Sequence, residues 1–200
     1  MRSTAAQPSI LLTRLRAETR TEHEAIEAVL GLMDNRLSRE RYQFVLERFY
    51  GFYRPLEPAI GDVGGWSGRG LDLDARRKSP WLEADLRALG CNRTKLDLCT
   101  DLPPHDTPAE CFGCMYVLEG STLGGQIISR HVREVLGVTP EAGGRFYDGY
   151  SDRTGEMWQS FRSALTRFVV SSDDHDVAIH AAKETFQKLN RWIAARGQSR

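Results

Sequence analysis

Apolar side chains recur at intervals of three and four residues along most of this chain, the spacing that places them on one face of an α-helix. The pattern predicts helices over residues 9–33, from Ser38 to an end or a kink at Pro55 and Pro58, and over 79–89, 107–137, 154–170 and 171–195. No segment alternates polar and apolar residues with period two. The sequence therefore predicts an all-α fold of about six or seven helices, in one domain over residues 9–196 with tails at 1–8 and 197–200.

The predicted helix over residues 107–137 has the clearest limits. Thr107 and Glu110 form a T-x-x-E capping box around Pro108, and Gly137 follows the last apolar position. Its apolar positions recur with helical spacing: Phe112, Met115, Tyr116, Leu123, Ile127, Ile128, Val132 and Val135. The sequence therefore predicts one long helix that contributes a face to the core.

Glycines interrupt the middle of this helix, at Gly120, Gly124 and Gly125. Each interior glycine costs about 1 kcal/mol relative to alanine. They are explained if a flat object touches the helix backbone or if the helix bends. The alternatives are close packing against another helix, or a break between two shorter helices.

His23 lies on the apolar face of the first predicted helix, three residues before Ile26. Arg16 and Arg20 precede it by seven and three residues and so share its face. An imidazole with two guanidinium groups beside it can bind a metal and the anionic groups of one cofactor. The alternatives are a histidine satisfied within the core and arginines paired with Glu24 or with Glu27.

Charge and hydropathy exclude several classes of protein. The 27 basic and 27 acidic residues balance, so no overall field attracts nucleic acid or a membrane surface. No apolar run approaches the roughly 20 residues needed to span a bilayer, and residues 1–9 lack the apolar core of a signal peptide. We therefore expect a cytoplasmic protein with no nucleic-acid or membrane partner.

Two other features have an ordinary interpretation and a functional one. The four cysteines are expected to pack as small apolar side chains; they are Cys91, Cys99, Cys111 and Cys114. The C-x-x-C pair formed by the last two is also compatible with a redox role or with half of a zinc site. The basic run at residues 76–78 is typical of a solvated surface, with docking of an acidic redox partner as the alternative.

Common catalytic motifs are absent from the sequence. The glycines do not follow a strand, so they do not form a phosphate-binding loop. Ser121 lacks the G-x-S-x-G setting of a nucleophile, and no pair of E-x-x-H motifs indicates a di-iron bundle. The histidine, the glycines and the arginines remain as candidate chemistry.

The chain resembles the bacterial, biliverdin-producing haem oxygenases, in particular those that accompany bacteriophytochromes. The resemblance rests on two segments about a hundred residues apart, AETRTEHEAIE and YVLEGSTLGGQ. The resemblance extends over about residues 10–195 and implies a haem-oxygenase-like helical bundle with a glycine-kinked distal helix. It implies that His23 is the proximal ligand of the haem iron and that the distal helix lies against the haem. The other residues it assigns are Gly120, Gly124 and Gly125 on the haem face, Arg16, Arg20 and Arg162 at the propionates, and Tyr116 and Phe186 in the pocket.

One position departs from the family pattern. Many haem oxygenases have an aspartate directly after the first distal glycine, where this chain has Ser121. A hydroxyl holds water but carries no charge, so the proton network must be based on water or on a donor elsewhere. Glu119 precedes the glycine and can point away from this site.

The resemblance implies oxidative cleavage of haem to biliverdin, ferrous iron and carbon monoxide. The chain has no flavin or nicotinamide motif, so electrons must come from a ferredoxin, another reductase or an external reductant. Biliverdin would then be available to a bacteriophytochrome. Two rivals remain: a haem carrier or sensor without turnover, suggested by Ser121, and a related bundle that binds no haem.

Overall fold

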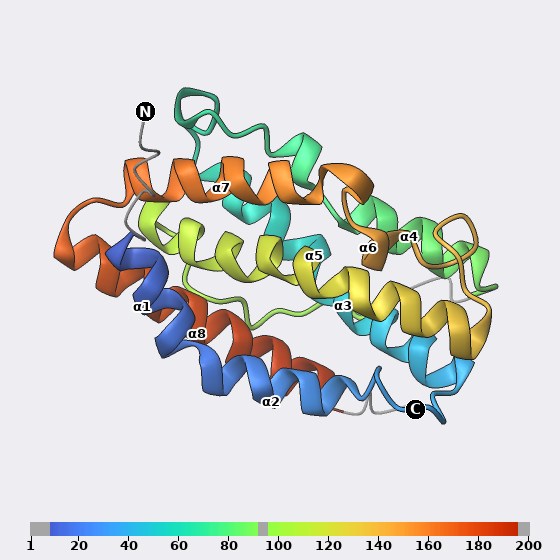
Figure 1. The fold of residues 1–200 in the computed structure, drawn as a ribbon. Helices are drawn as coiled ribbons and strands as arrows, with labels where there is room; N and C mark the ends of the chain where they lie inside the picture. Colours follow the sequence, from blue (N-terminus) through green and yellow to red (C-terminus); the bar gives the residue numbers. More distant parts are fainter. Residues whose placement is uncertain (1–8, 92–95, 196–200) are drawn as a thin grey trace, which may run out of the picture.

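The computed structural model describes residues 9–91 and 96–195, and these residues contain α-helices and short 3-10 turns but no strand (Figure 1). The predicted all-α fold is confirmed. The predicted tails at 1–8 and 197–200 lie outside the described residues. The α-helices are α1 (Ile10–Glu18), α2 (Arg20–Leu30), α3 (Arg39–Asp62), α4 (Ser79–Ala88), α5 (Pro108–Leu136), α6 (Arg145–Asp148), α7 (Thr154–Phe168) and α8 (Ser172–Ala194), with 3-10 turns at Ser67–Arg69, Asp74–Arg76 and Ser151–Arg153.

The long helix α5 is the centre of the bundle and packs against α6, α7 and α8 (Figure 1). A Cβ atom added to Gly113 would lie 2.2 Å from the carbonyl oxygen of Ala178, so this glycine permits the close approach of α5 and α8. Helix α8 also packs against α1, α2 and α3. It therefore holds the N-terminal helices and α5 in one framework.

The first predicted helix is in fact two helices, and the prediction of one continuous helix to Met33 was wrong. The chain leaves helical geometry at Thr19, which has φ −100° and ψ 4°. The buried Thr19 hydroxyl donates to the carbonyl oxygen of Leu15 at 2.7 Å, a local bond that competes with regular helix geometry. Helix α2 ends at Gly31, whose φ of 61° is left-handed. Met33 is 53% exposed and lies outside the apolar face.

The sequence left open an end of the helix or a kink at Pro55 and Pro58. Helix α3 continues past both prolines to Asp62, so the helix does not end there, and a kink stays a prediction. Leu56 and Ile60 beyond the first proline are buried. Burial of this apolar face favours continuation of the helix, which offsets the backbone hydrogen bonds that proline cannot make.

Helix α5 begins and ends where the sequence predicts. Thr107 and Glu110 form the reciprocal capping box, and Gly137 ends the helix with a φ of 70°. The helix is unbroken through its glycines, so the alternative of two shorter helices was wrong. A kink in its axis stays a prediction.

All four thiols are free, and those of Cys111 and Cys114 donate to loop carbonyls at His105 and Pro104, each at 3.2 Å. Burial raises the pKa of both thiols to about 12. The described residues contain no group of three or more side chains suited to a metal ion. Nor do these residues include a helix long and apolar enough to cross a membrane.

Cys111 and Cys114 should react slowly with thiol reagents in the folded protein. At pH 8 a thiol of pKa about 12 is only about 0.01% thiolate, the reactive form. In the unfolded chain both should label within minutes, whereas the half-buried Cys91 should label in both states. Mass spectrometry of labelled peptides measures this, and rapid labelling of the native Cys111–Cys114 pair would contradict it.

Candidate functional site

His23 lies on the outer side of α2, and the alternative of a satisfied core histidine was wrong. Its side chain is 56% exposed, and Nε2 is 3.7 Å from a carboxylate oxygen of Glu27. The imidazole rests edge-on against Phe186 of α8, with ring centroids 5.7 Å apart. The structure therefore brings together two predicted site residues and leaves the imidazole accessible to a ligand.

One face of α5 is open although it carries apolar residues. Leu123 and Ile127 are 43% and 64% exposed, so the expectation that they face the core was wrong. Gly120 and Gly124 lie on the same face, at helical spacing. A Cβ atom at Gly124 would meet nothing within 4 Å, and one at Gly120 would meet only Trp158, at 3.9 Å. Packing among residues 9–91 and 96–195 therefore does not explain these two glycines.

Gly125 has a different environment from the other two glycines. It is buried, and a Cβ atom there would lie 2.7 Å from the carbonyl oxygen of Tyr147 in α6. Close packing, one of the alternatives for the glycines, accounts for this position. The structure thus separates Gly125 from the open face formed by Gly120 and Gly124.

Tyr116 connects α5 to the junction of α1 and α2. Burial raises the pKa of its hydroxyl, and the Arg16 guanidinium and the Thr19 hydroxyl oppose that rise. Its ring lies 5.8 Å from that of Trp158 in α7. Arg16 and Tyr116, both predicted site residues, are therefore neighbours.

The other two predicted arginines differ in their contacts. Arg20 is exposed and its Nε is 2.7 Å from a carboxylate oxygen of Glu24, a hydrogen bond that raises the pKa of Arg20. The surface pair with Glu24, left open from the sequence, is thus confirmed. Arg162 is exposed and its guanidinium carbon lies 5.7 Å from the ring centre of Trp158. Trp158 therefore has both Arg162 and Tyr116 as neighbours.

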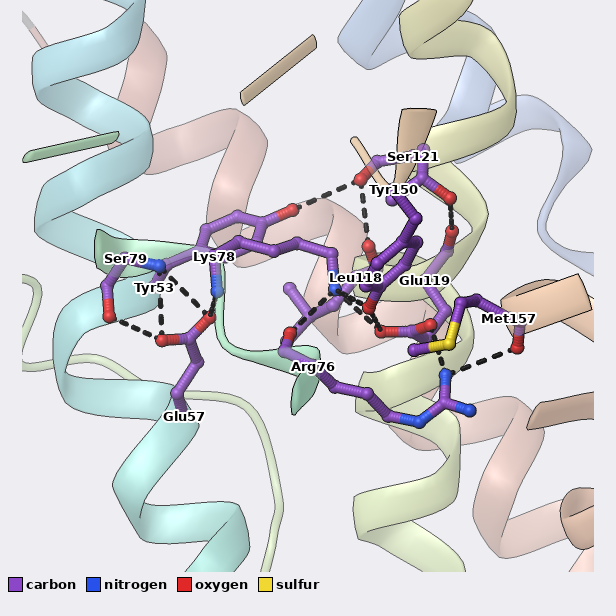
Figure 2. A network of polar contacts seen from close by, with 11 residues as sticks. Tyr53, Glu57, Arg76, Lys78, Ser79, Leu118, Glu119, Ser121, Tyr150 and Met157 are labelled. Atoms are coloured by element: carbon purple, nitrogen blue, oxygen red, sulfur yellow. Dashed lines mark hydrogen bonds and ion pairs between the residues drawn. The ribbon is translucent and has the colours of Figure 1, made fainter. Parts of the chain in front are cut away.

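Ser121 has a polar neighbour that the sequence did not identify. Its hydroxyl donates to the carbonyl oxygen of Leu118 at 2.8 Å and lies 3.4 Å from the hydroxyl of Tyr53 (Figure 2). Tyr53 comes from α3, is 1% exposed, and has its pKa raised by burial, so it keeps its proton at neutral pH. In the sequence this residue is one of several aromatic core positions, and no local pattern marks its contact with Ser121.

The basic run before α4 is largely buried, so its interpretation as a solvated surface or docking site was wrong for Arg76 and Lys78. These residues are 6% and 1% exposed. Arg76 Nη1 and Lys78 Nζ each lie 2.6 Å from a different carboxylate oxygen of Glu119 (Figure 2). Glu119 therefore points away from the open face of α5, in agreement with the expectation that its side chain can point away from this site.

Comparison with known proteins identifies the family. The Heme oxygenase family model matches residues 9–195. A protein of Xanthomonas campestris named heme oxygenase is 29% identical over 171 residues, which cover 82% of this chain and 96% of the relative.

Solved structures share the fold. The NO- and CO-bound heme oxygenase of Neisseria meningitidis aligns with a TM-score of 0.76 at 21% identity and covers 94% of both chains. Heme oxygenase-1 of the cyanobacterium Synechocystis, solved in complex with heme, aligns with a TM-score of 0.73 at 15% identity, over 92% of this chain and 91% of that one. The chain thus has the all-helical fold of these proteins. The chain belongs to the haem oxygenase family, whose members degrade haem.

Proposed function

We propose that this chain cleaves haem to biliverdin, ferrous iron and carbon monoxide, with haem bound between α2 and the open face of α5. The observation that carries the proposal is the pair Gly120 and Gly124. Each costs helix stability, and neither has a packing neighbour that requires glycine. A flat ligand that touches the helix backbone accounts for both.

The residues of the site suit haem. His23 offers an exposed imidazole for the iron, with Phe186 beside it to orient the ring. Leu123 and Ile127 offer apolar surface to the macrocycle. When bound, haem supplies the iron that binds oxygen and the carbon that is oxidised.

Arginines would fix the orientation of the macrocycle through its propionates. Arg16 and Arg162 lie near Tyr116 and Trp158 respectively and present exposed guanidinium groups. Arg20 must leave its pair with Glu24 to take the same part, which costs little because exposed ion pairs are screened by solvent.

Tyr53 and Ser121 would manage protons on the distal side. Both hydroxyls can hold water, and the neutral Tyr53 can donate through Ser121. This arrangement supplies a donor without the aspartate found after the first distal glycine in many family members.

The proposal extends to partners and location. Electrons come from a ferredoxin, another reductase or an external reductant, because the chain carries no flavin or nicotinamide motif. We place the reaction in the cytoplasm, and the GSTLGGQ segment favours biliverdin supply to a bacteriophytochrome.

A reconstitution experiment tests the proposed activity. Titration with haemin should sharpen the Soret band, and reductant in air should then replace that band with the red absorption of biliverdin. A stable oxy complex in reductant and air, with the Soret band retained, would instead support the carrier or sensor, which the serine at position 121 favours. A titration without a sharpened Soret band would leave only a bundle that binds no haem.

Tyr53→Phe should reduce turnover by roughly a hundredfold, the lower end of the range for groups that transfer protons in catalysis. Haemin affinity should stay within about twofold, because the aromatic ring and its packing remain. Tyr42→Phe is the matched control, since Tyr42 is a buried α3 tyrosine whose hydroxyl donates to the carbonyl oxygen of Gly143 instead. Equal turnover in the two variants would remove Tyr53 from the proton network.

A further inference from the structure

We propose that Glu119 is a positioning residue that fixes α5 at the point where its glycine-containing segment begins. Arg76, Lys78 and Tyr150 hold its carboxylate, and together these four residues form what we call the Glu119 cluster (Figure 2). The inference rests on the proposed function, because the segment that it positions contains Gly120 and Gly124, the proposed wall of the haem site.

The three charged residues of the Glu119 cluster are buried, Tyr150 is half-buried, and the Glu119 carboxylate and the Lys78 ammonium are fully hydrogen-bonded. The Lys78 ammonium, with three N–H groups, donates to Glu119 Oε1 at 2.6 Å, to the Arg76 carbonyl oxygen at 3.0 Å and to the Tyr150 hydroxyl at 3.2 Å. Tyr150 donates to the same Glu119 oxygen at 2.9 Å. Arg76 Nη1 donates to the other oxygen at 2.6 Å and to the Met157 carbonyl oxygen at 3.2 Å.

Stability alone does not account for such a cluster. Removing charges from water offsets most of what their attraction contributes, so a well-packed apolar replacement is often equally stable. The cluster does provide a fixed geometry, since the Glu119 carboxylate accepts from three places. These are the 3-10 turn that ends at Arg76, the start of α4 beside Lys78, and the segment before α7 that carries Tyr150.

A second carboxylate holds the cationic segment in place. Glu57 of α3 accepts from the backbone N–H of Lys78 at 2.6 Å and from the Ser79 hydroxyl at 2.5 Å (Figure 2). It therefore caps the start of α4 from outside that helix. Lys78, one of the two cations that hold Glu119, is thus anchored to the long helix α3.

The Glu119 cluster lies at a boundary along α5. From Cys111 to Glu119 every residue except Tyr116 is buried, whereas Leu123, Gly124 and Ile127 beyond it are exposed. With about 100° of rotation per residue, the side chains of Glu119 and Ser121 leave the helix on roughly opposite sides. The cluster and the contact between Ser121 and Tyr53 therefore hold α5 from two directions. Together they set the rotation of the helix, and with it the direction in which Gly120 and Gly124 face.

Hydrogen exchange of the haem-free protein tests this role without relying on haem. Glu119→Gln keeps the size of the side chain but leaves two buried cations facing a neutral amide. We expect amides in residues 120–128 to exchange roughly tenfold faster, because local opening becomes easier, while residues 111–118 change less. Tyr150→Phe keeps every charge and should shift the same amides in the same direction by a smaller factor, which gives a result even if Glu119→Gln does not fold.

Arg48→Met is the control for a general loss of stability. Arg48 is a buried cation on α3 whose Nε donates to the carbonyl oxygen of Trp192 in α8, at 2.9 Å, and it has no place in the proposed haem site. Each variant is measured the same number of degrees below its own melting temperature. Hydrogen exchange of residues 120–128 should then be faster than in the wild type in Glu119→Gln but not in Arg48→Met. Equal exchange of residues 120–128 in both variants would overturn the positioning role.

Haemin binding supplies a second measurement. Glu119→Gln should weaken haemin affinity by about tenfold, roughly 1.4 kcal/mol, and shift the visible spectrum of the ferric complex, whereas Arg48→Met should match the wild type in both. Wild-type affinity and spectrum in Glu119→Gln would also overturn the role. Failure of the wild type itself to bind haemin would overturn the proposed function, and the exchange comparison would then still decide whether Glu119 anchors the segment.

Discussion

His23→Ala should abolish normal turnover while leaving the fold intact. Loss of the proposed axial ligand should exceed the roughly 10–100-fold loss typical when a partner of a metal ligand is removed. The side chain is 56% exposed and its described contacts are the ring of Phe186 and the carboxylate of Glu27. Substitutions at such positions usually change the free energy of unfolding by less than about 0.5 kcal/mol. We therefore expect His23→Ala to lose turnover while its free energy of unfolding stays close to that of the wild type.

The measurements for this variant are the optical spectrum of its ferrous haem complex, the rate of biliverdin formation and the denaturant midpoint. Added imidazole should restore part of the wild-type spectrum, because it can enter the space that the side chain leaves. His180→Ala is the matched control, an exposed histidine of α8 outside the proposed site. A wild-type ferrous spectrum in His23→Ala would disprove the assignment of His23 as ligand.

Features that depend on neighbours in the sequence could be predicted without the structure. The capping box of Thr107 and Glu110 and the stop at Gly137 lie within a few residues of the ends of α5, and the structure has both. The helical spacing of apolar residues likewise predicted an all-α fold. Such signals are local because a helix satisfies its backbone hydrogen bonds within one segment.

Features that depend on contacts between distant segments could not be predicted. Lys78 and Glu119 are 41 residues apart, and Tyr53 and Ser121 are 68 apart. A basic run is usually solvated, and the burial of Arg76 and Lys78 depends on a distant residue, because the carboxylate of Glu119 supplies the opposite charge. The exposure of Leu123 and Ile127 was missed for a related reason. Helical periodicity shows which residues share a face, but the same pattern serves a face that packs on the protein and one that packs on a ligand.

Gly124→Ala and Gly125→Ala should change the stability of the haem-free protein in opposite directions. A methyl group at Gly124 meets nothing within 4 Å, so alanine should stabilise the helix by about 1 kcal/mol. A methyl group at Gly125 would lie 2.7 Å from the Tyr147 carbonyl oxygen. Relief of that contact must move α6 or α5, at a cost of about 1–3 kcal/mol. Denaturant unfolding of the two variants measures the change in the free energy of unfolding, which should be positive for Gly124→Ala and negative for Gly125→Ala.

Haem binding should reverse the advantage of the first substitution. Side chains at Gly124 would occupy the surface where we propose that the macrocycle lies, so Gly124→Val should lower haemin affinity by about tenfold to a hundredfold. Gly61→Ala is the matched control, because Gly61 is a helical glycine of α3 whose added Cβ also meets nothing within 4 Å. It should stabilise the chain and leave haemin affinity unchanged. Gly124 variants with the same affinity as Gly61→Ala would show that haem does not lie against the open face, and the two unexplained glycines would then need another ligand.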